Sequence, residues 1–254
     1  PADFAIVSVG IEALSATTRE LIEYGVKSVL VEKPAGINIS DILNLNKHCE
    51  RTGATVYVAY NRRFYSSVSK AAEIIQEDGG VNSFNFEFTE WSNTIEGLKK
   101  DNEVKSNWFL ANSTHVVDMA FFLGGKPGEI SCYLGGKDRL KWHPISSAFS
   151  GAGITVNDAL FSYQANWTAP GRWSLEILTS RHRLIFRPLE TLKIQHLSSL
   201  EEKLYELDDN LDKKYKPGLY LQIKAFLDQD DSKLCHIKEH VEMLKIYSRI
   251  AGYK

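Results

Sequence analysis

The chain has 254 residues, of which 43% are hydrophobic and 24% are charged, and its formal net charge is −2 at pH 7. These totals are typical of a water-soluble globular protein with one large domain or two ordinary ones, and they lack the basic excess of a nucleic-acid-binding protein. No apolar run approaches the length of a membrane span, and no signal peptide is recognisable.

The chain has three cysteines, Cys49, Cys132 and Cys235, which are far apart in the sequence and form no Cys-x-x-Cys pair. An odd number without metal-ligand spacing argues against a disulfide framework and against a zinc site. We therefore expect a cytoplasmic protein without a bound metal.

The front of the chain, residues 3–60, alternates between apolar runs and segments of helical spacing. Gly25 and Gly53 are expected helix stops, and Ser40 is the expected N-cap of the second helix. The order strand–helix–strand–helix–strand predicts parallel strands with right-handed crossovers. The expected strands are 4–9, 26–31 and 54–59, and the expected helices are 15–24 and 40–52.

A Gly-x-Gly-x-x-Gly turn, which normally opens a dinucleotide-binding sheet, does not occur in this sequence. The nearest candidates, Gly135-Gly136 and Gly151-Ala152-Gly153, are expected to be ordinary loops. Because the chain begins at Pro1 and enters a strand at once, we expect a segment to have been lost from the front of the parent protein.

After residue 60 closely spaced strand-like runs predict a mostly antiparallel sheet with a few helices, and 198–217 is expected to be an exposed excursion. The fold class is therefore α/β plus α+β, with a partial Rossmann-like domain at 1–62 and an α+β domain at 63–254. Expected helices are 66–77, 111–123, 219–228 and 236–250. Expected strands are 82–90, 129–134, 154–167, 172–179, 182–187 and 190–197.

The segment Lys27–Pro34 is an apolar strand that ends in Glu32-Lys33-Pro34. The carboxyl end of such a strand is where open α/β sheets bind ligands, and proline ends the strand. A lysine held there can donate a hydrogen bond to a substrate oxygen. A solvated lysine after a strand is the alternative.

Two further polar segments follow. Asn61-Arg62-Arg63-Phe64 comes directly after the third strand, where its arginines can neutralise a ligand anion or form ion pairs between domains. His115 and Asp118 share one face of an apolar helix, so His115 is a candidate proton carrier. The alternative is a core histidine hydrogen-bonded by Asp118.

In this order and spacing, these segments resemble the glucose–fructose oxidoreductase/inositol dehydrogenase (Gfo/Idh/MocA) family of nicotinamide-dependent sugar oxidoreductases. The resemblance implies hydride transfer between NAD or NADP and a hydroxyl or keto group of a sugar, cyclitol or nucleotide sugar. It implies that Lys33 polarises the reacting oxygen and that His115 exchanges its proton. It also implies a homo-oligomer through the open face of the second sheet.

Other site residues are expected from their positions. On the cofactor side, the strand ends and the arginine segment contribute Ser8, Val9, Glu32, Lys33, Pro34 and Arg62. On the substrate side, the expected contacts are Lys33, Trp108, Asn112 and His115, with Trp108 chosen because it leads into the His115 helix.

One departure stands against the resemblance. Many family members carry an aspartate four residues before the histidine, where this chain has Ala111. Together with the missing glycine-rich turn, it keeps open a non-catalytic fragment or homologue that acts as a sugar-binding or dimerisation module. A related lyase that uses bound cofactor for transient oxidation is also open.

The pair His236 and His240 lies four residues apart on the last expected helix. This spacing suits metal chelation, but no third ligand is placed by the sequence. We expect a solvated helix face.

Overall fold

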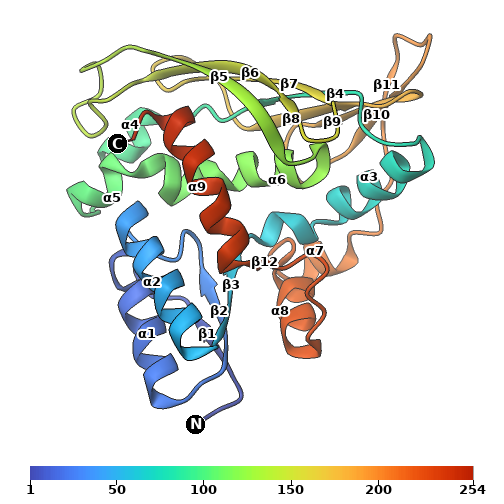
Figure 1. The fold of residues 1–254 in the computed structure, drawn as a ribbon. Helices are drawn as coiled ribbons and strands as arrows, with labels where there is room; N and C mark the ends of the chain where they lie inside the picture. Colours follow the sequence, from blue (N-terminus) through green and yellow to red (C-terminus); the bar gives the residue numbers. More distant parts are fainter. Residues whose placement is uncertain (254) are drawn as a thin grey trace.

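The computed structural model describes residues 1–253, which form two β-sheets with helices between and beside them (Figure 1). The smaller sheet has the strand order β1-β2-β3-β12, and the larger has the order β11-β10-β9-β8-β4-β7-β6-β5. The strands are β1 Phe4–Val7, β2 Ser28–Glu32, β3 Thr55–Ala59, β4 Ser83–Glu87, β5 Pro127–Gly135, β6 Ala148–Thr155, β7 Leu160–Asn166, β8 Ser174–Leu178, β9 His182–Phe186, β10 Lys193–His196, β11 Glu202–Leu204 and β12 Cys235–His236.

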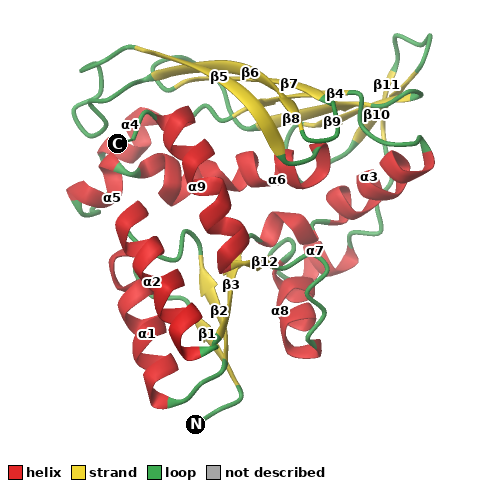
Figure 2. Ribbon diagram, viewed as in Figure 1, coloured by secondary structure: helices red, strands yellow, loops and turns green. Residues whose placement is uncertain are grey.

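The α-helices lie mostly between the sheets and around the smaller one, as Figure 2 shows in red. They are α1 Leu14–Tyr24, α2 Ile39–Thr52, α3 Ser66–Glu77, α4 Ser92–Glu96, α5 Asn102–Ser106, α6 Thr114–Gly124, α7 Asn210–Lys214, α8 Leu219–Asp228 and α9 Ile237–Ala251. Two irregular turns matter for the site: a 3-10 turn at Asn61–Phe64 and a π-helical turn at Phe109–Ser113.

The small sheet confirms the predicted parallel unit, because β2 pairs in parallel with both β1 and β3. The N-cap of α2 is Asn38, whose side chain accepts a hydrogen bond from the Asp41 amide, so the assignment to Ser40 was wrong. Two residues that suit the capping role stood close together in the sequence, and only the backbone decides which takes it.

The end of the chain returns to the small sheet. β12 pairs antiparallel with β3, and α9 contacts α2 and β3 on one side and β5 and β6 on the other. Residues far apart in the sequence therefore meet at the carboxyl ends of the parallel strands.

The large sheet is antiparallel except for the pairing of β4 with β7. The single strand expected at 154–167 is wrong: β6 and β7 are separate strands joined by a turn in which Asp158 has a φ of 64°. Gly151 and Gly153 lie within β6, not in a loop. A Cβ at Gly153 would overlap the backbone carbonyl of Glu129 on the neighbouring strand β5, so the close approach of the two strands requires glycine there.

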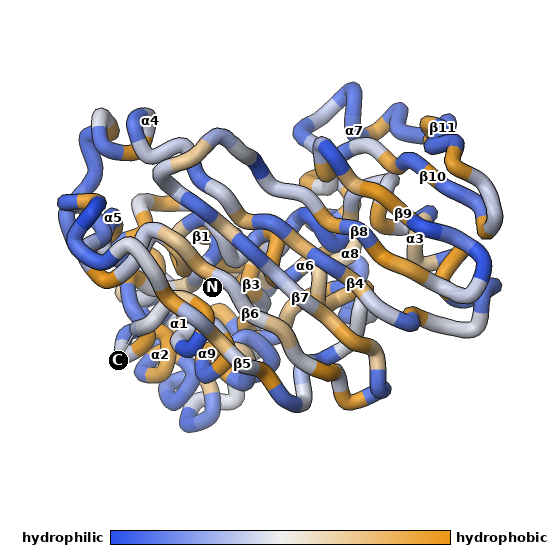
Figure 3. Tube along the Cα trace, turned by 90° about the horizontal axis from the view of Figure 1, so that it is seen from above, coloured by the Kyte–Doolittle hydropathy of each residue, from blue (hydrophilic) through white to orange (hydrophobic). Residues whose placement is uncertain are grey.

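One face of the large sheet packs on α6, where the buried Phe84 and Phe86 contact Phe121, and the buried Phe88 packs on Phe109 of the π-helical turn. Seen from above, its strands alternate hydrophilic and hydrophobic residues (Figure 3), which is the pattern of a sheet covered on one side. The outward residues are mostly small and polar. No helix within residues 1–253 is long and apolar enough to cross a membrane.

The excursion at 198–217 is mostly exposed as expected, although it contains β11 and α7. Its last residues dock on the 3-10 turn, where the Asn61 side-chain amide donates to the carbonyl of Pro217 at 2.9 Å. Gly218 follows with a φ of +71°, and a Cβ there would lie 2.1 Å from the Asn61 carbonyl. This close approach brings Lys216 near the site described next.

Candidate active site between the two sheets

Lys33 comes directly after β2, in a turn closed by the Ala35 amide, which donates to the Glu32 carbonyl. Its side chain is buried, and its ammonium donates to the backbone carbonyl of Ala111. Burial, together with the nearby positive charge of Arg62, lowers the pKa of Lys33 to about 7. An amine in this state both donates and accepts a proton near neutral pH.

The turn that carries Lys33 is held from the other end of the chain by His240. The His240 Nε2 lies 3.1 Å from the Pro34 carbonyl, and its Nδ1 lies 3.3 Å from the Tyr60 hydroxyl. His240 is buried and His236 caps α9, so the solvated face expected for this pair was wrong. His240 lies on the buried face of α9 together with apolar residues such as Ile237 and Leu244. The described residues contain no cluster of side chains that could hold a metal ion.

His115 begins α6 and is buried, with its ring edge-on to Tyr60 at 6.0 Å between centroids. Its Nδ1 is buried and, within residues 1–253, makes no hydrogen bond. Burial holds the pKa of His115 well below its usual range, and the charges of Arg62 and Lys33 add to the effect. The ring is therefore neutral at pH 7, with one of its two nitrogens carrying no proton.

Asp118 is not the partner of His115. Arg63 holds it with two hydrogen bonds, from Nε at 2.9 Å and from Nη2 at 2.6 Å, and the same Nη2 lies 2.8 Å from Glu239. Of the two interpretations open for the arginines, Arg63 therefore takes the structural one. It ties the 3-10 turn to α6 and α9.

A buried carboxylate that the sequence did not single out, Glu90, lies just after β4. Four side chains donate to it: Ser113 at 2.7 Å, Asn112 at 3.0 Å, and Arg172 and Trp173 at 3.3 Å each. Burial raises the pKa of Glu90, although these donors oppose the shift. No motif surrounds Glu90, so only its place after a strand end hinted at a role.

Glu90 also bears on the missing aspartate. Ala111 offers only its carbonyl, to Lys33, whereas the adjoining Asn112 and Ser113 bind Glu90. The negative charge of Glu90 partly offsets the lowering of the Lys33 pKa. The carboxylate of Glu90, which follows β4, thus lies near Lys33, whereas the expected aspartate would have come from position 111.

Among the tryptophans, Trp173 lies nearest His115, and the centroids of the two rings are 6.2 Å apart. Trp108, the expected substrate contact, packs edge-on against Trp142 at 6.3 Å, and Trp142 stacks on Trp167. A substrate role for Trp108 stays a prediction.

The expected cofactor residues lie at two neighbouring strand ends. Ser8 and Val9 follow β1 and are exposed, while Glu32, half-buried, ends β2 beside Lys33. Pro34 is buried against His240, and its expected contact with a cofactor stays a prediction. Arg62 extends from the 3-10 turn toward Trp173, with its guanidinium carbon 5.0 Å from the ring centroid.

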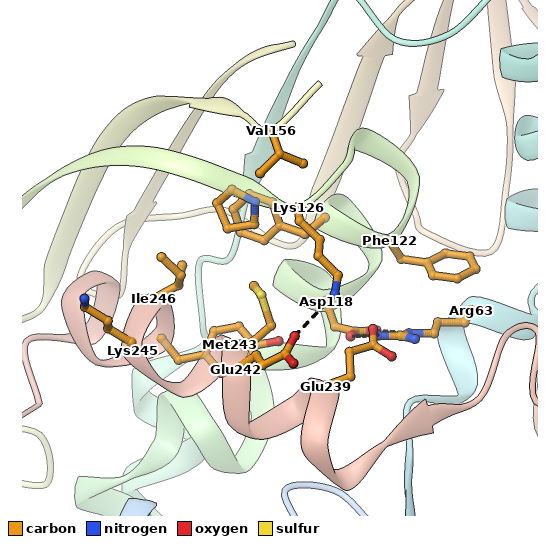
Figure 4. Close-up of a pocket in the computed structure, with 13 residues that line it drawn as sticks. Arg63, Asp118, Phe122, Lys126, Val156, Glu239, Glu242, Met243, Lys245 and Ile246 are labelled. Atoms are coloured by element: carbon orange, nitrogen blue, oxygen red, sulfur yellow. Dashed lines mark hydrogen bonds and ion pairs between the residues drawn. The ribbon is translucent and has the colours of Figure 1, made fainter. Parts of the chain in front are cut away.

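A separate cavity of about 260 Å³ lies between α6, α9 and the start of β5 (Figure 4). Most of the charged side chains that line it form ion pairs with one another: Arg63 with Asp118 and Glu239, and Lys126 with Glu242 at 3.3 Å. It shares no lining residue with the group around Lys33 and His115. The group around Lys33 and His115 is the candidate site, because these two side chains are buried without a carboxylate partner in the described residues.

No family model and no curated protein matches this chain. Solved structures do match. An NAD-binding oxidoreductase from Klebsiella pneumoniae is 15% identical with a TM-score of 0.74, over 99% of this chain and 77% of the other.

Two further structures have the same architecture. An inositol dehydrogenase homologue from Azotobacter vinelandii, in complex with NADH and myo-inositol, is 15% identical with a TM-score of 0.73, over 99% of this chain and 75% of the other. A UDP-N-acetylglucosamine 3-dehydrogenase from Acidithiobacillus ferrooxidans is 12% identical with a TM-score of 0.71, over 99% and 77%. The chain therefore has the two-sheet fold expected from the Glu-Lys-Pro resemblance, and this prediction is confirmed.

Proposed function

We propose that the chain belongs to an NAD- or NADP-dependent oxidoreductase that transfers a hydride between nicotinamide and a hydroxyl or keto group of a sugar, cyclitol or nucleotide sugar. The observation that carries the proposal is the pair formed by Lys33, whose pKa is about 7, and the neutral His115 beside it. Solved structures of the same fold include dehydrogenases bound to NADH and to myo-inositol, which supports the reaction class.

In the direction of oxidation, the neutral His115 accepts the hydroxyl proton of the substrate, and Lys33 donates a hydrogen bond to the same oxygen as it becomes a carbonyl. Burial of both side chains excludes water from these bonds. When bound, the nicotinamide supplies the acceptor or donor of the hydride. In the reverse direction His115 returns the proton to this oxygen, while Lys33 keeps its hydrogen bond to it.

The residues present fit the nicotinamide half of such a cofactor. The ends of β1 and β2, with the exposed Ser8 and Val9 and the half-buried Glu32, flank Lys33 at the edge where open α/β sheets bind dinucleotides. Val9, 46% exposed, offers an apolar surface for a flat ring. On this basis residues 1–62 are assigned as part of the cofactor domain and 63–254 as the substrate domain.

The remaining predictions concern assembly and location. The outward face of the large sheet carries small polar residues around Tyr133, which is 70% exposed, and we propose that a second copy of the chain packs there. All three cysteines are free thiols, which supports a reducing cytoplasm.

The test is a fluorescence titration of the folded chain with NADH and then NADPH. Saturable binding of one of them is expected, followed by oxidation or reduction of a sugar in a substrate screen. Lys33→Met should keep cofactor affinity within a few-fold while losing turnover. A folded sample that binds neither cofactor contradicts the proposal and favours a sugar-binding or dimerisation module.

A further inference from the structure

Two arginines lie over the same tryptophan ring beside the site. The guanidinium carbon of Arg62 is 5.0 Å from the Trp173 ring centroid, and that of Arg172 is 4.5 Å from it. Arg172 also lies over Trp91 at 4.8 Å. Stacking of this kind holds a guanidinium in a fixed orientation while leaving the N–H groups in its plane available.

The charge on these arginines is poorly matched by the protein. Arg62 forms no ion pair with any carboxylate in the described chain, and its buried Nε lacks a hydrogen-bond partner there. Its Nη1 donates only to the neighbouring Asn61 side chain, at 3.1 Å. Burial lowers the pKa of Arg62, although the nearby Glu190 and Glu32 carboxylates oppose the shift.

Arg172 has one acidic partner, and that partner is shared. Its Nη1 lies 3.3 Å from Glu90, whose oxygens already accept from Asn112 and Ser113 at shorter distances. The Arg172 side chain is 46% exposed, so its remaining N–H groups are accessible.

Further positive charge surrounds the same place. Lys33 and the exposed Lys216 both lie near enough to His115 to lower its pKa. Glu90 and Glu32 are the nearby acids that act on Lys33. Acids lie among these basic groups: Glu190 and Glu32 act on Arg62, and Glu90 acts on Lys33, but none of them forms an ion pair with Arg62 in the described chain.

We propose that Arg62 and Arg172 form a subsite for an anionic group of the substrate, a carboxylate or a phosphate, placed next to the sugar carbon that reacts. Guanidinium groups suit both anions, because each presents parallel N–H donors to two oxygens. The inference rests on the proposed hydride-transfer function and narrows its substrates to sugar acids or phosphorylated sugars.

The position of Arg172 distinguishes this subsite from the cofactor side. Arg172 and Trp173 belong to the connection between β7 and β8 of the large sheet, whereas the expected nicotinamide contacts Ser8 and Val9 end β1 of the small sheet. Arg62 lies in the 3-10 turn that connects the small sheet to the rest of the chain. It can therefore hold the anionic group of the substrate close to Lys33 and His115.

The experiment compares binding of D-glucuronate, D-glucose 1-phosphate and D-glucose to the full chain by isothermal titration. At least one anionic sugar should bind about tenfold or more tightly than glucose, as expected for charge-assisted hydrogen bonds. The two anionic sugars separate a carboxylate from a phosphate subsite. Arg62→Gln and Arg172→Gln should each remove the preference, and Arg62→Lys should retain part of it.

The matched control is Arg183→Gln, which removes an exposed arginine of β9 that pairs with Glu176 at 3.4 Å. It should leave the preference unchanged, and thermal unfolding by circular dichroism verifies that every variant is folded. Equal affinity for glucose and both anionic sugars overturns the inference. So does a loss of NADH affinity in the arginine variants with unchanged sugar binding, because the arginines then serve the cofactor.

Failure of the subsite and failure of the proposed function give different results. A chain that prefers an anionic sugar without binding NADH or NADPH keeps the subsite and loses the hydride transfer. A chain that oxidises neutral sugars, unaffected by Arg62→Gln, keeps the function and loses the subsite.

Discussion

Arg62 and Arg63 are neighbours in the sequence but lie in opposite electrostatic surroundings. Arg63 is buried against Asp118 and Glu239, with ion-pair distances of 2.6 and 2.8 Å, so its charge is matched within the fold. Arg62 lies over Trp173 without a carboxylate partner in residues 1–253, beside Lys33 and His115. Matched buried charge holds elements together, whereas unmatched charge at a strand end is available to a ligand.

The largest effect that we expect is on turnover. It concerns Lys33 and His115, the neighbours of the unpaired Arg62. Lys33→Met and His115→Ala should each lower kcat by about 10²- to 10⁴-fold, because each removes a group that moves or holds the substrate proton. Steady-state kinetics with the sugar found in the screen gives the measurement. Near-normal turnover in both variants would show that the site lies elsewhere.

The next effect compares the two arginines by stability. Arg63→Met should lower the free energy of unfolding by about 3–5 kcal/mol, because it leaves the buried Asp118 carboxylate without its partner. Arg62→Met should cost less than about 1 kcal/mol, since it loses mainly stacking on Trp173. Urea unfolding monitored by circular dichroism measures both. Equal losses would remove the distinction between the two arginines.

The smallest effect concerns the pH dependence that Lys33 gives to stability. Its pKa is about 7 in the fold and 10.5 as a free side chain, so between pH 7 and 9 the unfolded chain holds a proton that the folded chain has lost. Unfolding then takes up a proton, and its free energy rises with pH, by about 2 kcal/mol over this window. Urea unfolding of wild type and Lys33→Met at both values isolates the contribution. An identical pH slope in the two proteins would mean that Lys33 is charged and paired in the fold.

Local patterns predicted much of the fold. The helices α3 at 66–77 and α8 at 219–228 have the bounds expected from periodicity, because their apolar stripes and stop signals lie within the segment itself. β12 and the separation of β6 from β7 were missed. A two-residue strand carries no pattern, and the turn at Asp158 has no glycine or proline to mark it.

The site was predicted only in part. Lys33 and His115 were selected because each belongs to a recognisable segment, and the fold brings them near one another, but their catalytic role stays a prediction. Glu90, Arg172 and Trp173 were not selected, because their meeting depends on how β4, β7 and β8 lie beside α6. The contacts of Glu90 with Arg172 and Trp173 join residues more than 80 positions apart, and no sequence motif predicts them.

By itself, the sequence determined the parallel unit, the antiparallel sheet and the lysine at the end of β2, since strand and helix patterns and a proline act over a few residues. The tertiary structure alone decided which charges are matched. Asp118 pairs with Arg63 rather than His115, Glu90 lies beside the turn that carries Ala111, and the buried Nε of Arg62 has no hydrogen-bond partner in the described residues. Charge balance in a buried site depends on distances and desolvation among side chains from distant segments, and these exist only in the folded chain.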